Sequence, residues 1–277
     1  MNRRTFVLGA AAIATGCTRS GESNPAPKAA QPLGVQLYTV RDLMAQDVAA
    51  TLNLVASAGF REVEFAGYFD YTPAEMRKML EASGLAAPST HIGKDQFVED
   101  AAEVIDHAAA MGHRYVVVSS VGEEERSLDD FRRHAADFNR WAEACAAAGL
   151  TFAYHNHWYE FEETDGGIPY DLLLAETDPE LVKLEMDLAW AYGGGADILA
   201  YFSAWPGRFP LVHLKDFRGG EEVDIGTGDV PFDAILAHAK LAGIEHGFVE
   251  RDHPADPAEA LRYNHDAIAP AWDRALA

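Results

Sequence analysis

Eight short apolar runs, rich in Val, Leu, Phe and Tyr, alternate with longer stretches of helical period from Leu33 onward. Because no Asn-Gly or Asp-Gly turn joins two of these runs, we expect parallel strands connected by helices. The predicted strands are Gly34–Tyr38, Glu62–Ala66, Ala86–Thr90, Tyr115–Ser119, Thr151–Tyr154, Val182–Met186, Leu211–Leu214 and Gly247–Val249. Eight such strands close a barrel, for which about 250 residues is the usual length. The sequence therefore predicts an α/β fold, a single (β/α)8 TIM barrel over residues 33–277.

Capping signals mark several helix ends. Thr72-Pro73-Ala74-Glu75 has the form of a capping box with proline at the first helical position, and Gly84 follows the same helix. Asp256-Pro257-Ala258-Glu259 repeats this pattern for the last helix, and Ser127–Asp130 opens a long helix that ends near Gly149. These signals support the alternation of strands and helices.

Residues 1–32 are predicted to be a signal and linker that precede the barrel. The paired-arginine start Asn2-Arg3-Arg4-Thr5-Phe6 is followed by an apolar run too short to span a membrane, which is typical of a twin-arginine export signal. Ala14-Thr15-Gly16-Cys17 resembles a bacterial lipoprotein cleavage box, so Cys17 is a candidate for a lipid anchor, with plain cleavage as the alternative. The residues up to Pro32 are rich in Ser, Gly and Pro and predict a flexible linker. We therefore expect an exported protein, either periplasmic or a membrane-anchored lipoprotein.

The charge of the chain disfavours polyanionic partners. There are 44 acidic and 22 basic residues, a formal charge of −22. Removal of residues 1–30, which hold four basic residues and one acidic residue, would leave −25. A nucleic acid would approach against this field, so we predict no nucleic-acid partner. Together with the predicted export, the charge also argues against a phosphorylated sugar as the substrate.

Polar residues follow four consecutive predicted strands. They are the stretches His155–His157, Glu185–Asp187, His213–Asp216 and Glu250–His253. The active site of a TIM barrel lies at this end of its strands. Imidazole and carboxylate groups together form a ligand set for a divalent ion such as Mn²⁺, Zn²⁺, Co²⁺ or Mg²⁺. Such an ion would polarise a sugar carbonyl or hydroxyl and stabilise an enediolate.

Six segments between Leu33 and Ala275 carry a family resemblance. They are Gly34–Arg41, Tyr154–Phe161, Leu184–Asp187, Val212–Asp216, Ile225–Gly228 and Phe248–Glu250. The chain resembles the xylose-isomerase-like TIM barrels of the sugar phosphate isomerase/epimerase family. That family also includes ketose 3-epimerases, hydroxypyruvate isomerase, inosose dehydratase and relatives of endonuclease IV. These motifs are specific for the superfamily and leave the reaction open.

The resemblance implies a metal site at the ends of the fifth to eighth strands, where the family uses Glu, Asp, His and Glu. Asp187, His213 and Glu250 match three of these positions, and His155 stands where many members have the first glutamate. Mn²⁺ is the ion expected first, with Zn²⁺, Co²⁺ and Mg²⁺ as alternatives. The exchange at His155 keeps a ligand but removes one of the two glutamates that the family's epimerases use as acid and base.

This departure favours a lyase or hydratase of 3-keto-glycosides. Some exported members of the family that have a comparable His-Asn-His stretch resemble such enzymes. A ketone at C3 acidifies the C2 proton and a leaving group departs from C1, so one base, one metal ion and one acid suffice. Glu250 is the expected base or a ligand, and His157 or Lys215 is the expected acid. Isomerase or epimerase action on a ketose or sugar phosphate is the alternative, and a non-catalytic sugar-binding barrel is a third hypothesis.

Three further residues are candidates for contact with the carbohydrate substrate. His91 follows the third predicted strand, Glu64 is expected to point into the barrel, and Trp190 is placed to stack on a sugar ring. Each has a structural alternative, which is a simple hydrogen bond for His91, a buried ion pair for Glu64 and packing for Trp190. Since members of the family often dimerise, a homodimer is one expected assembly.

Overall fold

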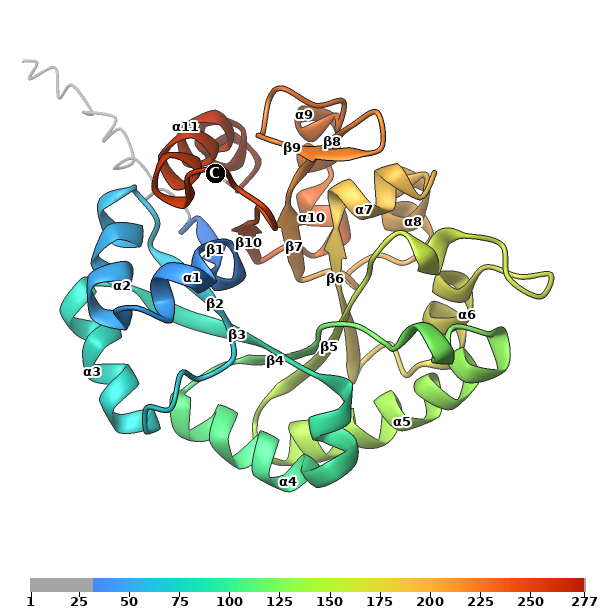
Figure 1. Cartoon of the computed structure of the whole chain (residues 1–277). Coiled ribbons are helices and arrows are strands. Elements are labelled where there is room, and N and C mark those ends of the chain that lie inside the picture. The colour runs from blue at the N-terminus through green and yellow to red at the C-terminus, as the bar shows by residue number, and fades with distance from the viewer. Residues whose placement is uncertain (1–31, 277) are drawn as a thin grey trace, which may run out of the picture.

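The computed structural model describes residues 32–276, which form a closed barrel of eight parallel strands inside a ring of helices (Figure 1). Around the barrel the strands follow the order β1-β10-β7-β6-β5-β4-β3-β2. They are β1 (Gly34–Gln36), β2 (Glu62–Ala66), β3 (Ala86–Ile92), β4 (Tyr115–Val118), β5 (Thr151–His155), β6 (Val182–Asp187), β7 (Leu211–Leu214) and β10 (His246–Val249). The predicted (β/α)8 TIM barrel is confirmed.

The helices cover the outside of this barrel, as Figure 1 shows. They are α1 (Arg41–Met44), α2 (Val48–Ser57), α3 (Pro73–Ser83), α4 (Lys94–Met111), α5 (Leu128–Ala147), α6 (Pro169–Glu176), α7 (Leu188–Gly193), α8 (Ile198–Ala204), α9 (Phe232–Leu236), α10 (Ala239–Ala242) and α11 (Pro257–Leu276). Short 3-10 turns at Leu37–Val40, Glu123–Glu125 and Tyr159–Phe161 follow β1, β4 and β5. These turns therefore lie at the carboxyl-terminal mouth of the barrel, where the strands end.

Three strands extend past their predicted ends. β3, β5 and β6 continue to Ile92, His155 and Asp187, because backbone pairing with the neighbouring strands persists there. β1 is shorter than predicted, since the side chain of Gln36 accepts the backbone N–H of Tyr38 at 3.0 Å and starts a 3-10 turn. As a result, several polar residues expected in loops lie within rigid strands.

An antiparallel hairpin interrupts the expected alternation after β7. It pairs β8 (Asp216–Arg218) with β9 (Glu221–Val223). Gly219 and Gly220 form its turn with φ of +60° and +93°, values that suit a two-residue hairpin loop. The expectation of parallel strands alone was therefore wrong for this segment, because the Gly-Gly pair is itself a hairpin signal.

The predicted helix caps are confirmed. The hydroxyl of Thr72 accepts the backbone N–H of Glu75, whose carboxylate accepts the backbone N–H of Thr72, and Gly84 ends α3 with a φ of +70°. Ser127 makes the same reciprocal arrangement at the start of α5. The carboxylate of Asp256 accepts two backbone N–H groups in the first turn of α11. Each cap satisfies donors that the first helical turn would otherwise leave unpaired.

Apolar side chains fill the space between barrel and helices, and a smaller cluster lies among the strands themselves. The smaller cluster consists of Tyr115, Val117, Ala153, Leu211 and Phe248. Because strand side chains alternate between the two faces, these residues point into the barrel. The same alternation brings His155, His213 and Glu250 to the interior one step nearer the carboxyl ends. The interior therefore contains an apolar layer directly below the polar residues at the carboxyl-terminal mouth.

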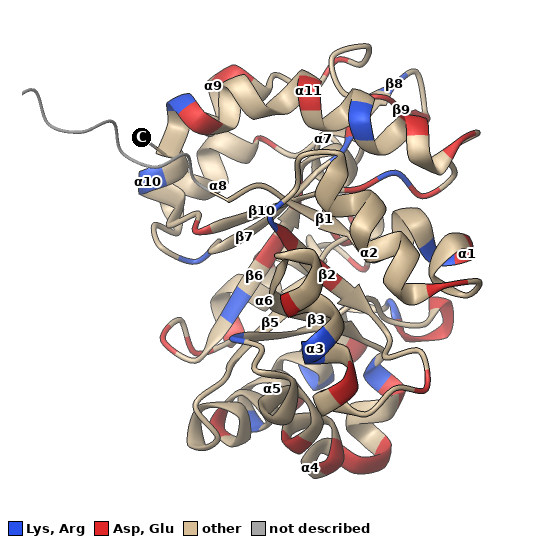
Figure 2. Cartoon of the chain, turned by 90° about the vertical axis from the view of Figure 1, so that its left-hand side faces the viewer, with Lys and Arg blue, Asp and Glu red and all other residues tan. Residues whose placement is uncertain are grey.

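The predicted signal, the Cys17 anchor and nearly all of the linker lie outside the described residues. Within residues 32–276, no helix is both long enough and apolar enough to cross a membrane. Figure 2 marks Asp and Glu residues in red along the ribbon of several outer helices, including α4 and α11. The division of the chain into residues 1–32 and 33–277 stays a prediction.

Candidate active site

The pairing register of the strands determines which polar side chains lie at the same height in the barrel. Glu185 of β6 lies beside His155 of β5, and Asp187 lies beside His213 of β7. Glu185 and Asp187 are two residues apart on one strand, so both point into the barrel, with Asp187 nearer the mouth. The predicted site residues from β5 to β10 are thus arranged in two successive layers.

Glu64, at the centre of the lower layer, is fully buried. Its carboxylate accepts hydrogen bonds from the amide of Gln36 at 2.8 Å and the hydroxyl of Ser89 at 2.5 Å. Nε2 of His213 lies 2.7 Å from the same carboxylate, and Nε2 of His91 lies 3.2 Å away. Glu64, predicted to contact substrate, lies behind these side chains.

Three imidazoles from three strands surround the carboxylate of Glu185. Its Oε2 is 2.5 Å from Nε2 of His91, 3.2 Å from Nδ1 of His155 and 3.2 Å from Nε2 of His213. Its other oxygen, Oε1, is buried without a hydrogen-bond partner in the described chain. Burial, with the negative charge of Glu64, raises the pKa of Glu185 to about 7. This carboxylate was not among the predicted site residues, although its spacing from Asp187 is the period-2 signal of a shared strand face.

The upper layer contains a lysine among three carboxylates. Nζ of Lys215 lies 2.9 Å from Glu250, 3.2 Å from Asp187 and 3.1 Å from Asp252. Nδ1 of His213 lies 2.8 Å from Glu250 and 3.9 Å from Asp187. Burial disfavours the charge on Lys215, but Asp187 and Glu250 outweigh it and raise its pKa well above the usual range. Lys215 is therefore a buried ammonium held by its neighbours.

Asp187 is held by backbone as well as by Lys215. Its Oδ1 accepts the backbone N–H of Trp190 at 2.8 Å, and its own backbone N–H donates to Asn156 at 3.1 Å. Its Oδ2 lies within ion-pair distance of Lys215 but makes no hydrogen bond of suitable angle in the described chain. One buried oxygen of Asp187 is thus available for a further ligand.

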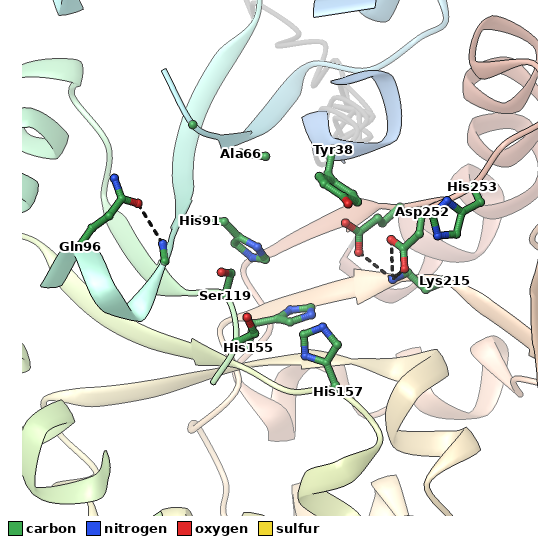
Figure 3. Close-up of a pocket in the computed structure, with 14 residues that line it drawn as sticks. Tyr38, Ala66, His91, Gln96, Ser119, His155, His157, Lys215, Asp252 and His253 are labelled. Carbon is green, nitrogen blue, oxygen red and sulfur yellow. Dashed lines mark hydrogen bonds and ion pairs between the residues drawn. The ribbon is translucent and has the colours of Figure 1, made fainter. Parts of the chain in front are cut away.

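A cavity of about 460 Å³ opens over both layers at the barrel mouth (Figure 3). Its lining consists of Tyr38, Ala66, Gly67, His91, Gly93, Gln96, Ser119, Ser120, His155, His157, Lys215, Glu250, Asp252 and His253. Figure 3 shows His91, His155 and His157 pointing toward the same space that Tyr38 and Lys215 border. Tyr38, Gln96 and Ser119 are lining residues that sequence reasoning missed, whereas Asp252 belongs to the predicted polar stretch Glu250–His253.

His157 and Glu160 lie at the β5 side of the cavity. The carboxylate of Glu160 accepts the backbone N–H of His157 at 2.8 Å and the hydroxyl of Tyr154. Burial raises the pKa of Glu160 to about 7 and, together with the charge of Lys215, lowers the pKa of His157 to about 3. His157 is therefore a neutral imidazole on a loop that a buried glutamate holds in place.

Trp190, predicted to stack on a sugar, is not among the described residues that line the cavity. Its ring lies 5.0 Å from Nζ of Lys215, a cation–π contact, and 6.3 Å from the ring of His157. The structure thus places Trp190 behind two of the proposed catalytic side chains.

The donors suit a divalent ion and fall into two groups that share His213. One group is His91, His155, Glu185 and His213, and the other is Asp187, His213 and Glu250. Within each group the ligand atoms lie within 4.8 Å of one another. The four ligands predicted from the family are therefore divided, with His155 in the first group and Asp187 and Glu250 in the second. Each group also has a carboxylate oxygen without a hydrogen bond in the described residues, Oε1 of Glu185 in the first group and Oδ2 of Asp187, which faces the ammonium of Lys215, in the second.

The chain is similar to enzymes of carbohydrate metabolism. It is 25% identical to an inosose dehydratase of Geobacillus kaustophilus (strain HTA426), with 79% of this chain and 83% of that protein covered. It is 26% identical to a solved sugar phosphate isomerase/epimerase from Parabacteroides distasonis ATCC 8503, with a TM-score of 0.77 and coverage of 91% and 98%. At 14% identity and a TM-score of 0.72, the IOLI protein with a bound zinc atom shares the fold, over 88% of this chain and 99% of its own.

Residues 52–269 match the family described as xylose isomerase-like TIM barrel, which is most of the chain. The match extends from α2 into α11 and includes every strand except β1, so it covers both layers of the site. The predicted resemblance is confirmed, and the chain belongs to the xylose isomerase-like TIM barrel family.

Proposed function

We propose that this protein is a divalent-metal-dependent lyase or hydratase that acts on an unphosphorylated sugar with a ketone at C3. The observation that carries this proposal is the pair formed by Glu250 and Lys215, 2.9 Å apart at the cavity wall. One carboxylate and one ammonium form a base and an acid, as an elimination or a hydration requires. His155 occupies the strand end at which a paired-carboxylate epimerase would need its second carboxylate.

The family supports the wider class of this reaction. The chain is a metal-dependent enzyme of the sugar isomerase and epimerase type, and its inosose dehydratase relatives extend that type to eliminations. A bound divalent ion would polarise the ketone oxygen and make the neighbouring C–H bond more acidic. His155, Asp187, His213 and Glu250 are the ligands proposed from the sequence, and both donor groups beside the cavity fit such an ion.

Glu250 is the proposed base. Burial opposes its charge, but Lys215 and His213 outweigh burial and hold its pKa well below the usual range. The carboxylate is therefore ionised and takes the proton from C2. The electrons of the C2–H bond form a C1–C2 double bond while the C1–O bond of the glycoside breaks. Hydration is the reverse of this elimination with water in place of the alcohol: the water oxygen adds at C1, and a proton is added at C2.

Lys215 is the proposed acid, which gives a proton to the departing alcohol oxygen. When Glu250 takes up the C2 proton, Lys215 loses a negative partner and holds its own proton less tightly. Asp187 and Asp252 keep the ammonium in position. His157, the second candidate acid, is a neutral ring, so it suits a hydrogen bond to a sugar hydroxyl better than proton donation.

The lining of the cavity supports an unphosphorylated substrate. Among the described lining residues, Lys215 is the one lysine or arginine, and three carboxylates already surround it. Phosphate groups are usually bound by arginine, lysine or a run of backbone N–H groups. Hydroxyl and imidazole groups from Tyr38, Ser119, Ser120 and His157 suit sugar hydroxyls instead.

The test is to incubate the metal-loaded protein with a 3-keto-glycoside, with free ketoses and with ketose phosphates, and to follow each by nuclear magnetic resonance. A 2-hydroxy-3-keto-glycal or free 3-keto-sugar supports the proposal. Inversion at C2 or C3 without loss of the aglycone, or turnover of a ketose phosphate, supports the isomerase or epimerase hypothesis that the Parabacteroides similarity favours. Binding without turnover of any substrate supports the non-catalytic barrel.

We also propose export by the twin-arginine route, on the basis of Arg3 and Arg4, with Cys17 as a candidate lipid anchor. Fractionation of cells that express the full chain and an Arg3→Lys/Arg4→Lys variant tests this. Retention of the variant in the cytoplasm is expected. A Cys17→Ser variant that still sediments with membranes would rule out the anchor. Light scattering of the purified protein tests the predicted homodimer, for which the mass of two chains is expected.

A further inference from the structure

Two donor groups at different depths compete for His213. The inner group consists of His91, His155, Glu185 and Nε2 of His213, and the outer group consists of Asp187, Glu250 and Nδ1 of His213. The two nitrogens of one imidazole point away from each other, so each group uses a different nitrogen. Which group holds the divalent ion decides which side chains remain free for proton transfer.

The ligand atoms of the inner group lie closer to one common point than those of the outer group do. Nitrogen atoms from β3, β5 and β7 all lie within 3.2 Å of Oε2 of Glu185. All four residues lie within strands of the closed barrel, β3, β5, β6 and β7, so their positions are set by rigid backbone. The second oxygen of Glu185 is buried without a partner in the described residues. His91 and His155 also line the cavity, so this group faces the space for substrate.

The two donor groups also differ in how their negative charge is neutralised. The outer carboxylates are already neutralised, since the ammonium of Lys215 contacts Asp187 and Glu250 directly. Glu185 of the inner group and Glu64, which contacts His91 and His213 of that group, have no ion pair with lysine or arginine within residues 32–276, and their ion-pair partners are all histidines. Two buried carboxylates without a fixed cation match the charge of one divalent ion.

The donor types agree with this difference. Three imidazoles and one carboxylate are the ligands of zinc-type sites, whereas carboxylate-rich sets suit Mg²⁺ and Mn²⁺. The outer group offers one imidazole and two carboxylates. The inner group therefore predicts a preference for Zn²⁺ or Co²⁺ over Mn²⁺.

We propose that this chain holds its divalent ion in the inner group, through His91, His155, His213 and Glu185, and leaves Asp187, Glu250 and Lys215 as protein groups of the reaction. The inference rests on the metal-dependent part of the proposed function. It removes a conflict in the sequence-based assignment, in which Glu250 is both ligand and base. It also assigns His91 to the ion, where the sequence suggested contact with the sugar.

Metal content of the purified full chain and of matched variants tests this ligand set. Glu185→Gln and His91→Ala remove inner donors, and Asp187→Asn and Glu250→Gln remove outer donors by the same carboxylate-to-amide exchange. After dialysis against Zn²⁺, we expect about one ion per wild-type chain. Affinity should weaken by more than about tenfold in the inner variants and by less than that in the outer ones, which lose neighbours but no ligand. Weakening confined to the outer variants would overturn the inference.

X-ray absorption fine structure of the Zn²⁺-loaded wild type gives a second readout that needs no variant to fold. The inner group predicts three imidazole ligands. Two imidazoles would indicate the set proposed from the sequence, one would indicate the outer group, and either count overturns the inference. Absence of any bound ion would overturn the metal-dependent part of the proposed function as well. Turnover of the 3-keto-glycoside with an outer ligand set leaves the proposed function standing while the inference fails.

Discussion

Nζ of Lys215 lies 2.9 Å from Oε2 of Glu250, and both side chains are buried at the wall of the same cavity. In this pair a proton donor and a proton acceptor lie side by side and stabilise each other's charge. A syn elimination across two adjacent carbons uses such a pair on one side of the substrate.

Replacement of Glu250 by glutamine should remove the base with little change in shape. We expect kcat for 3-keto-glycoside cleavage to fall by about 10² to 10⁴-fold, the usual contribution of a positioned general base. The exposed Glu259→Gln on α11 is the matched control and should retain wild-type activity. A kcat for Glu250→Gln within tenfold of wild type, measured with saturating Zn²⁺ or Co²⁺, would show that another group removes the proton.

Replacement of Lys215 by methionine should leave Asp187, Glu250 and Asp252 without their shared cation. Removing one partner of a buried ion pair costs about 3–5 kcal/mol, so the free energy of unfolding in urea should fall by this order. Lys240→Met, at an exposed position on α10, should change it by less than about 0.5 kcal/mol. Equal stability of the two variants would mean that the carboxylates are not charged in the folded state.

Replacement of Glu160 by glutamine should flatten the pH dependence of stability. Burial raises the pKa of Glu160 to about 7 from an ordinary value of 4.5, so the folded protein binds its proton more tightly and loses stability as the pH rises through 7. Between pH 5.5 and 8 this loss is about 2 kcal/mol for one group with such a shift. Glutamine can still accept the His157 N–H, and its amide can donate to the Tyr154 hydroxyl.

Urea unfolding of wild type and Glu160→Gln at both pH values measures the difference directly. The wild type should lose about 2 kcal/mol more than the variant between pH 5.5 and 8. Because all other titrating groups are common to the two proteins, parallel pH profiles would contradict the assignment of this raised pKa to Glu160.

Replacement of Asp216 by asparagine should loosen the segment after the hairpin. The carboxylate of Asp216 accepts the backbone N–H groups of Phe217, Gly226, Gly228 and Val230 at 2.8 to 3.1 Å. An amide would turn a donor toward two of them, at a cost of about 2 kcal/mol. The exposed Asp229→Asn in the same segment is the control. Faster proteolysis at residues 224–230 in the first variant alone is the expected result.

The alternation of apolar runs and helical stretches was sufficient for the fold, because each run of about five residues is buried on both faces in a parallel barrel. The strand Val182–Asp187 shows a feature that this alternation does not predict. The sequence predicts a strand that ends at Met186, which leaves Asp187 in the following loop, whereas β6 includes Asp187. Backbone pairing with β5 and β7 extends the strand, and no local signal reports such pairing. The hairpin at Gly219-Gly220 is the opposite case, because its Gly-Gly pair is a local signal that is visible in the sequence.

The sequence by itself determined the barrel, the helix caps, the family, and the arrival of His155, Asp187, His213 and Glu250 at one end of the strands. Only the tertiary structure decided how these residues are grouped. His91 and Glu64 come from β3 and β2, far along the chain, and closure of the barrel brings them within 3.2 Å of residues on β6 and β7. Partition of the donors into two groups depends on the side to which each ring nitrogen of His213 turns. That orientation is set by packing and charge across the barrel, which a linear pattern of residue types does not record.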